Sequence, residues 1–237
     1  MNRSPNSAAW RLAILSLLAV TGLGLAACSS SPAASTAKST TTTESSSKAS
    51  SSPSSQLSNL SSSLQGAETA SYKATYSATD NGQSETLTYE QQPPKFLFGT
   101  KGGEVIDNGT ATYFCSTSGA STCLSSTTQD PLAPLLNALS PKTAISDLQA
   151  AQSALAAKVA GYTASFSSAT FAGQPSTCVT ITQSSGAEKV CVTGSGELDY
   201  VSSSPSQVFQ MTSYSTSVSA SDFALPSGAT VVTEPSV

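Results

Sequence analysis

Apolar and polar side chains alternate along most of this chain after residue 70, and this period of two constrains the fold more than any other feature. From Tyr72 to Ala78 every second residue is Tyr or Ala, and the residues between them are Lys, Thr or Ser. An Asp-Asn-Gly turn at 80–82 is followed by Leu87 and Tyr89 in the same alternation, which predicts a β-hairpin. Further strands are predicted at 95–98, 104–106, 110–115, 164–170, 177–182, 188–193, 197–201 and 207–218, and together they make an antiparallel meander.

Two helical patterns interrupt the strands. Asp130 and Pro131 suit the N-cap and the first position of one helix, and Ser140 with Pro141 restarts the pattern in a second helix that ends near Gly161. The apolar stripes lie at Leu132, Leu135, Leu136 and Leu139 in the first helix, and at Ile145, Leu148, Leu155 and Val159 in the second. These stripes need a surface to cover, so we predict an α+β fold with both central amphipathic helices packed on one face of the sheet.

The amino terminus has the layout of a secretory signal peptide: Arg3 and Arg11 accompany an apolar run over 12–27 that ends in small residues. The run is short for a membrane span. The Leu-Ala-Ala-Cys sequence that ends at Cys28 resembles the lipobox of bacterial lipoproteins. This resemblance implies that residues 1–27 are removed after general export. Cys28 would then carry acyl chains such as palmitate and hold the protein on the outer face of the cell membrane. The alternative is an ordinary secretory signal with a cysteine there by chance.

Residues 28–66 consist almost entirely of Ser, Thr, Ala and Pro. Such a segment has too little apolar surface to offset the entropy of ordering, so we predict a disordered tether that begins at the lipidated Cys28. Leu57, Leu60 and Leu64 have a faint helical spacing, which we interpret as one frayed turn at the end of the tether. The remainder, residues 67–237, is long enough for a single domain with its own core.

Four cysteines follow Cys28, and an oxidising compartment favours their pairing. Cys178 and Cys191 are equally far from the centre of a predicted turn, so a symmetric hairpin would place them opposite each other. Cys115 and Cys123 bracket a short loop in a similar way. We therefore predict the disulfides Cys115–Cys123 and Cys178–Cys191. A zinc site with four cysteines is the alternative, but the spacings are wider than such sites use, and we expect no metal.

The chain contains no histidine, which removes Ser-His-Asp and Cys-His catalysis and His-ligated metals. It also lacks a nucleophile elbow, a phosphate-binding loop and a dinucleotide fingerprint. The carboxylates Glu85, Glu90, Glu104 and Asp107 are the nearest candidates for glycosidase chemistry, but acids beside turns are more often solvated surface. We expect no enzyme activity and no cofactor. Charge is sparse and the net charge is −4, so nucleic acid is not an expected partner.

The remaining candidates for a functional site are apolar residues on the sheet and on the first predicted helix. Placed on the concave face of a curved sheet, they would either line a cavity for an apolar ligand or fill an ordinary core, and the sequence leaves both readings open. The candidate pocket residues are Tyr72, Tyr76, Phe96, Phe98, Phe114, Leu135, Leu139, Phe166, Phe209 and Met211.

The order of several segments is similar to actinobacterial lipoproteins in or near the LolA-like half-barrel group, which includes the mycobacterial LppX and LprG type. The segments are the lipobox, the Ser-rich tether, the hairpin over 72–89, Pro-Pro-Lys-Phe at 93–96, Val-Ile-Asp-Asn-Gly at 105–109 and Tyr-Phe-Cys at 113–115. The segment 222–229 looks like the C-terminal strand and turn of that group. The resemblance implies an open, curved antiparallel sheet packed on helices, with a cavity for acyl chains.

Two functions follow from these readings. The first is a lipid-anchored envelope protein that binds or carries a lipid or lipidated ligand, with acyl burial contributing about 0.8 kcal/mol per methylene. The alternative is a structural or sensory envelope lipoprotein with a filled core that acts through contacts with a protein partner, whose identity the sequence does not give. A cavity on the concave face would favour the first function, and a packed core would favour the second.

Overall fold

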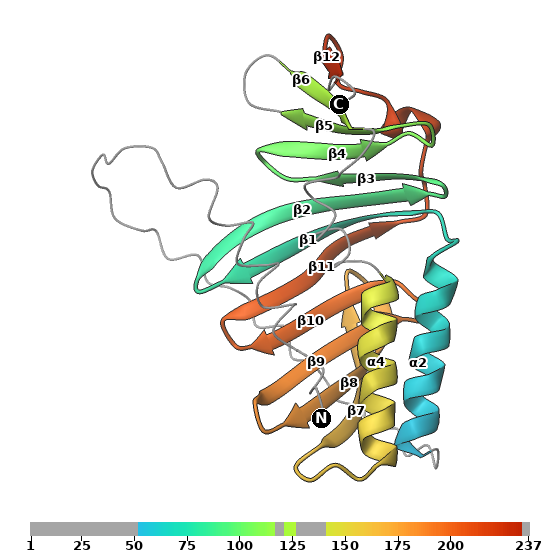
Figure 1. Ribbon diagram of the computed structural model, residues 1–237, viewed down its shortest axis with the longest axis vertical. Helices are drawn as coiled ribbons and strands as arrows, with labels where there is room; N and C mark the ends of the chain where they lie inside the picture. Colours follow the sequence, from blue (N-terminus) through green and yellow to red (C-terminus); the bar gives the residue numbers. More distant parts are fainter. Residues whose placement is uncertain (1–51, 117–120, 127–140, 234–237) are drawn as a thin grey trace, which may run out of the picture.

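The computed structural model describes residues 52–116, 121–126 and 141–233. Its framework is one curved sheet of 12 strands in the order β12-β6-β5-β4-β3-β2-β1-β11-β10-β9-β8-β7, and it does not close into a barrel (Figure 1). The first strands are β1 (Tyr72–Asp80), β2 (Gln83–Gln92), β3 (Lys95–Gly99), β4 (Gly103–Asp107), β5 (Thr112–Ser116) and β6 (Thr122–Ser126). The others are β7 (Thr163–Phe171), β8 (Gln174–Gln183), β9 (Gly186–Thr193), β10 (Leu198–Ser204), β11 (Gln207–Ser215) and β12 (Thr230–Thr233). The α+β half-barrel fold is therefore confirmed.

Two antiparallel meanders meet in the middle of the sheet, where β1 pairs with β11. The chain makes β1 to β6 in one direction from this seam and returns to it through β7 to β11 from the other end. The hairpin predicted over 72–89 is present, with Asp80 opposite Gln83. Asn81 and Gly82 have φ angles of 48° and 83°, the left-handed pair that a tight two-residue hairpin turn requires.

Helix α2 (Pro53–Ala67) corrects the predicted boundary of the tether, because residues 53–66 belong to the folded domain. Ser52 caps the helix by accepting a hydrogen bond from the Ser55 backbone N–H at 3.3 Å, and a proline stands in the first turn. Leu57, Leu60 and Leu64 are all buried. Their spacing of three and four residues places them on one helix face, and burial of that face outweighs the weak helix propensity of the serines between them.

Helix α4 (Pro141–Ala156) begins at the proline from which the second helix was predicted. It packs against α2, and Gln152 Nε2 donates a hydrogen bond to Ser58 Oγ at 3.0 Å. The two helices lie together over the part of the sheet that contains β7 to β10 (Figure 1). The first predicted helix, including Leu135 and Leu139, falls outside the described residues, so the partner that the structure shows for α4 is α2.

The described residues form two apolar cores. The larger core lies between α2, α4 and one face of the sheet, and it includes Tyr76, Phe209 and Met211. The smaller core contains Leu97, Ile106 and Phe223, and Phe223 comes from the 3-10 helix η2 (Ala220–Phe223). The segment 222–229 was expected to hold a strand and a turn. Its start is instead the end of this helix, which a Ser219–Asp222 capping box begins, whereas the turn is present at 227–228 and strand β12 follows only at Thr230. No helix within the described residues is long and apolar enough to cross a membrane.

Candidate functional site

The structure brings most of the predicted pocket residues together in the larger core. Tyr72, Tyr76, Phe98, Phe209 and Met211 are buried in this core. Phe96, Phe114 and Phe166 are partly buried and pack against it. Leu135 and Leu139 lie outside the described residues. Because these side chains come from β1, β3, β5, β7 and β11, the cluster depends on the complete sheet and not on one hairpin.

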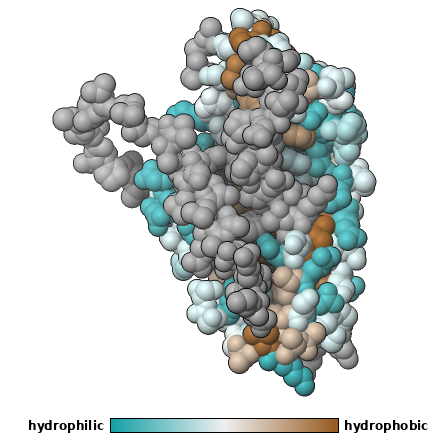
Figure 2. Space-filling model, viewed as in Figure 1, coloured by the Kyte–Doolittle hydropathy of each residue, from teal (hydrophilic) through white to brown (hydrophobic). Residues whose placement is uncertain are grey.

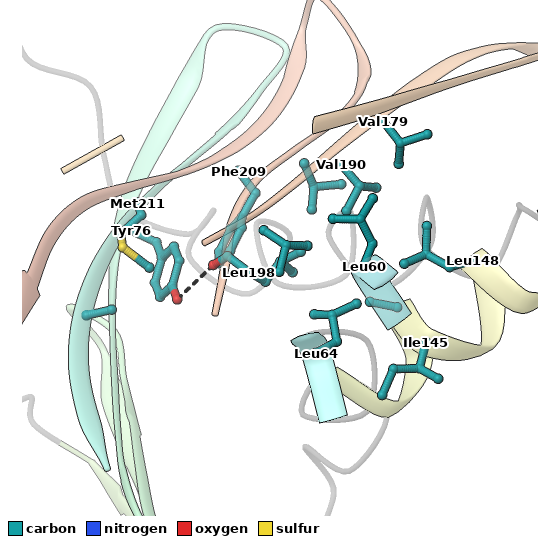
Figure 3. Close-up of a cluster of buried hydrophobic side chains, with 14 of the residues drawn as sticks. Leu60, Leu64, Tyr76, Ile145, Leu148, Val179, Val190, Leu198, Phe209 and Met211 are labelled. Atoms are coloured by element: carbon teal, nitrogen blue, oxygen red, sulfur yellow. Dashed lines mark hydrogen bonds between the residues drawn. The ribbon is translucent and has the colours of Figure 1, made fainter. Parts of the chain in front are cut away.

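The buried aromatic rings pack on one another. Tyr76 and Phe209 are stacked with ring centroids 4.4 Å apart, and the Tyr76 hydroxyl donates a hydrogen bond to the Leu198 carbonyl at 3.1 Å (Figure 3). The ring of Tyr72 lies 5.7 Å from that of Tyr89 and 6.1 Å from that of Tyr214. Burial raises the pKa of Tyr76 well above its ordinary value, so the hydroxyl remains protonated and able to donate. Tyr76 and Phe209 are thus buried from solvent and packed against each other.

Leucines of the two helices complete this part of the core. Figure 3 shows Leu60 and Leu64 of α2 beside Ile145 and Leu148 of α4, on the side of the helices that faces the sheet. The sheet contributes the valines of β8 and β9 and Leu198 of β10 to the same cluster. Over β8 to β10, the concave face is therefore a packed interface between helices and sheet.

A continuous apolar row crosses the concave face along the strand register. Its members, from β11 across β1 to β6 and on to β12, are Tyr214, Ala74, Tyr89, Phe98, Val105, Phe114, Leu124 and Val232. Phe98 and Val105 are buried, whereas Leu124 and Val232 at the far end are 45% and 44% exposed. The row thus runs from the core to an open edge of the sheet, where Figure 2 shows hydrophobic residues at the surface of the molecule.

A buried polar cluster at the start of β10 is a feature that the sequence reading did not single out. Glu197 is almost fully buried and accepts hydrogen bonds from the hydroxyls of Thr193, Ser195 and Tyr214, at 2.6 Å from Ser195 and 2.9 Å from Tyr214. Burial alone would raise the pKa of Glu197, but these donors outweigh it and the pKa is lowered, so the carboxylate is ionised at neutral pH. Its charge is compensated by hydroxyl donors in place of a cation.

Asp199 has a less favourable environment. Its side chain is 0% exposed, Oδ2 accepts a hydrogen bond from the Ser176 hydroxyl, and Oδ1 has no partner among the described residues. Burial, only partly offset by the Ser176 hydrogen bond, raises the pKa of Asp199 from 3.8 to about 6. The signal in the sequence was the pair of acids at 197 and 199 inside a predicted strand, where charged residues are unusual.

The turn before β10 packs closely on the last turn of α2. Gly196 has a φ of 102°, and a Cβ added there would collide with the Ser63 carbonyl oxygen of the helix. At the C-terminal end of the helix, Gln91 Nε2 of β2 donates hydrogen bonds to the carbonyls of Ala67 and Ala70, at 2.5 Å and 2.7 Å. These contacts join the C-terminal end of α2 to β2 and β10, so α2 is an integral part of the domain.

Two of the four carboxylates considered for catalysis, Glu90 and Asp107, have structural partners. Glu90 is buried and forms an ion pair with Lys73 at 2.5 Å. Asp107 accepts a hydrogen bond from the Gly109 backbone N–H at 2.8 Å in the turn after β4. Glu104 lies near enough to Glu90 for the two charges to interact, and its pKa is raised mainly by burial. Among the described residues, no group of three or more His, Cys, Asp or Glu side chains could hold a metal ion.

Both disulfides are formed, and each joins neighbouring strands of the sheet. Cys115 of β5 is bonded to Cys123 of β6, and Cys178 of β8 is bonded to Cys191 of β9. In both cases the two cysteines are direct partners in the strand register. The first disulfide is buried in the smaller core beside Phe223, so it fixes β5 and β6 to each other near the open end of the apolar row.

No protein-family model matches the chain, and no curated protein matches it. The crystal structure of MucB is similar, with a TM-score of 0.50 and 16% identity over 75% of this chain and 66% of MucB. A complex of Pseudomonas aeruginosa MucA and MucB matches with a TM-score of 0.42 and 16% identity, over 68% of this chain and 56% of that one. An uncharacterized conserved protein from Thermus thermophilus matches with a TM-score of 0.46 and 6% identity, over 76% of this chain and 99% of that one.

The fold is thus one that occurs in MucB: an open, strongly curved sheet with helices on one face. This chain spans 66% of the length of MucB. At 16% identity, the likeness defines the architecture of the domain, and the function has to be argued from the site.

Proposed function

We propose that this chain is an envelope protein, held on the outer face of the cell membrane through Cys28, that binds a protein partner through the surface of its half-barrel. The observation that carries this proposal is the packing around Tyr76, whose ring is stacked on Phe209 and whose hydroxyl is bonded to Leu198. Since these rings fill their own core, recognition is assigned to the surface. Catalysis forms no part of the proposal.

Protein binding is also supported by a structural neighbour. MucB has been crystallised in complex with MucA(peri), and MucB shares the fold of this chain. A fold is a weak guide to function. The fold shared with MucB therefore supports the hypothesis of a protein partner, and the packed core around Tyr76 remains the main support for it.

Lipid carriage is the second candidate, and the apolar row is the observation that favours it. The row reaches the open edge at Leu124 and Val232, both nearly half exposed. Acyl chains laid along it would gain about 0.8 kcal/mol for each buried methylene. The resemblance to LolA-like carriers of the LppX and LprG type points in the same direction.

Native mass spectrometry of the secreted Cys28→Ser chain separates the two candidates, because the substitution removes the acylation site and releases the domain without detergent. The chain would be isolated gently from a related host. If the proposal is right, the chain is found in a complex that is heavier by the mass of one protein. This complex should dissociate in high salt or urea. An adduct of lipid mass that organic extraction removes would overturn the proposal in favour of carriage. Failure of the unsubstituted chain to incorporate radiolabelled palmitate would contradict lipid attachment at Cys28.

A further inference from the structure

Strand β12 (Thr230–Thr233) is attached to the sheet differently from its neighbours. It lies at one end of the strand order and pairs with β6 in parallel, whereas the other described strand pairs are antiparallel. All four of its residues are exposed. It therefore contributes backbone hydrogen bonds to the sheet but adds little to either core, and parallel pairing is slightly weaker per residue.

The edge that receives β12 is, by contrast, rigid. β6 is fixed to β5 by five register pairs and by the Cys115–Cys123 disulfide. Its side chain at Leu124 is 45% exposed and lies directly beside Val232. A rigid edge with an exposed apolar residue on it can hold an added strand without reorganising, which lowers the entropic cost of docking.

The segment that leads into β12 is anchored separately. Phe223 is buried in the smaller core with Leu97 and Ile106, seven residues before β12 begins. Between them, Leu225 and Ala229 also pack against the smaller core, and the described backbone hydrogen bonds of residues 224–229 are local, such as Ala229 N–H to the Pro226 carbonyl at 3.0 Å. Release of β12 would therefore leave the anchor at Phe223 and both cores in place.

We propose that the β6 edge is the docking site for an extended segment of the protein partner, and that β12 occupies this edge in the free protein and is exchanged on binding. This inference rests on the proposed function, because it names the site and the kind of partner segment. Here β12 itself shows what the edge accepts: a strand parallel to β6 with the sequence Thr-Val-Val-Thr.

The chemistry of the edge narrows the partner segment further. β6 reads Thr-Cys-Leu-Ser-Ser and carries no charge, so a charged strand would gain no ion pair there and would lose solvation. An aliphatic residue at the position of Val232 would extend the apolar row through Leu124 to Phe114. We therefore expect an uncharged segment with adjacent β-branched residues, flanked by small hydroxyl residues.

The first test uses a fluorescent peptide with the sequence of residues 226–233 as the probe and the full Cys28→Ser chain as the receptor. In the variant Ser125→Cys/Thr233→Cys, a disulfide between register partners would lock β12 onto β6 and leave Leu124 in place. The variant Thr233→Ser, which keeps Ser125, is the matched control, near in size but unable to form the link. We expect saturable peptide binding to the wild-type chain and to the serine control, and at least a tenfold loss in the locked variant, about 1.4 kcal/mol. Equal binding to the locked and control variants would overturn the proposal.

Amide hydrogen exchange of the full chain gives a second readout that does not depend on the peptide. The amides of Val231 and Val232 should exchange through local opening, far faster than those of Val105 and Phe114. Protection of β12 equal to that of β4 would overturn strand exchange. A partner that binds the locked variant as tightly as the wild type would leave the proposed function standing and overturn only this docking site.

Discussion

Tyr76 of β1 and Phe209 of β11 stack at 4.4 Å across the seam where the two meanders meet, and the Tyr76 hydroxyl reaches over to the Leu198 carbonyl of β10. One side chain therefore links three strands of the sheet. Tyr76→Phe keeps the stacked ring but leaves the buried Leu198 carbonyl without this donor. We expect a loss of about 1–2 kcal/mol in the free energy of unfolding, measured by urea denaturation. Phe209→Leu tests the ring contact separately, and an unchanged stability in both variants would contradict the packing described.

The close packing of Gly196 on α2 predicts that alanine substitutions at three glycines lower the free energy of unfolding by different amounts. In Gly196→Ala the new Cβ would meet the Ser63 carbonyl at a φ of 102°, so we expect a loss of about 2–4 kcal/mol. Gly186 has a φ of 134° with open space around it, and the strain alone should cost about 1 kcal/mol. Gly194 has neither constraint, so Gly194→Ala should stay within about 0.5 kcal/mol of the wild type. Equal losses in the three variants would argue against the contact with Ser63.

The buried carboxylate Asp199 makes stability depend on pH. Because burial raises its pKa to about 6, the folded state binds the proton more tightly than the unfolded state. The protonated Asp199 side chain therefore makes its full contribution to the free energy of unfolding below about pH 4, and this contribution is lost as the pH rises through 6. Glu197 has a lowered pKa and acts in the opposite sense, but mainly at acidic pH.

Asp199→Asn removes this titration and should stabilise the protein at pH 7 by on the order of 2 kcal/mol, with little gain at pH 4. Urea denaturation at both pH values measures the difference. Glu68 is an exposed carboxylate, and Glu68→Gln should change the free energy of unfolding by less than about 0.5 kcal/mol at either pH. A destabilised Asp199→Asn variant at pH 7 would show that the carboxylate is satisfied by a partner we have not identified.

Helix α2 sets the start of the domain at Ser52. A chain that begins at residue 67 loses three buried leucines, each worth about 1.5–3 kcal/mol, which together approach the stability of a typical domain. We expect a chain that begins at residue 52 to unfold cooperatively in thermal denaturation and a chain that begins at 67 to show no cooperative transition. Leu60→Ala in the longer chain should cost about 2–5 kcal/mol. Cooperative unfolding of the chain that begins at residue 67 would show that α2 is not required for folding and would support a tether that ends at residue 66.

The hairpins could be predicted because their determinants are local. The turn at 80–82 needs left-handed backbone at Asn81 and Gly82, and the alternation that follows fixes which side chains face the core. The pairing of Cys178 with Cys191 follows from the same logic, since both stand equally far from one turn. The expected pocket residues on the strands lie in or against one core because alternation assigns a side chain to a face of the sheet.

Local patterns in the sequence thus predicted ten of the twelve described strands, the Cys178–Cys191 register, the cysteine pairs and the start of helix α4, whereas strands β6 and β12 were not predicted. The tertiary structure decided three further features: the burial of α2, the hydroxyl cage around Glu197, and the apolar row that ends at Leu124 and Val232. Leu57, Leu60 and Leu64 stand in a serine-rich segment that would not hold a helix without a surface to cover. Each of these features includes contacts between residues far apart in the chain, such as Tyr214 with Glu197, and the energy of such contacts appears only when the sheet brings the partners together.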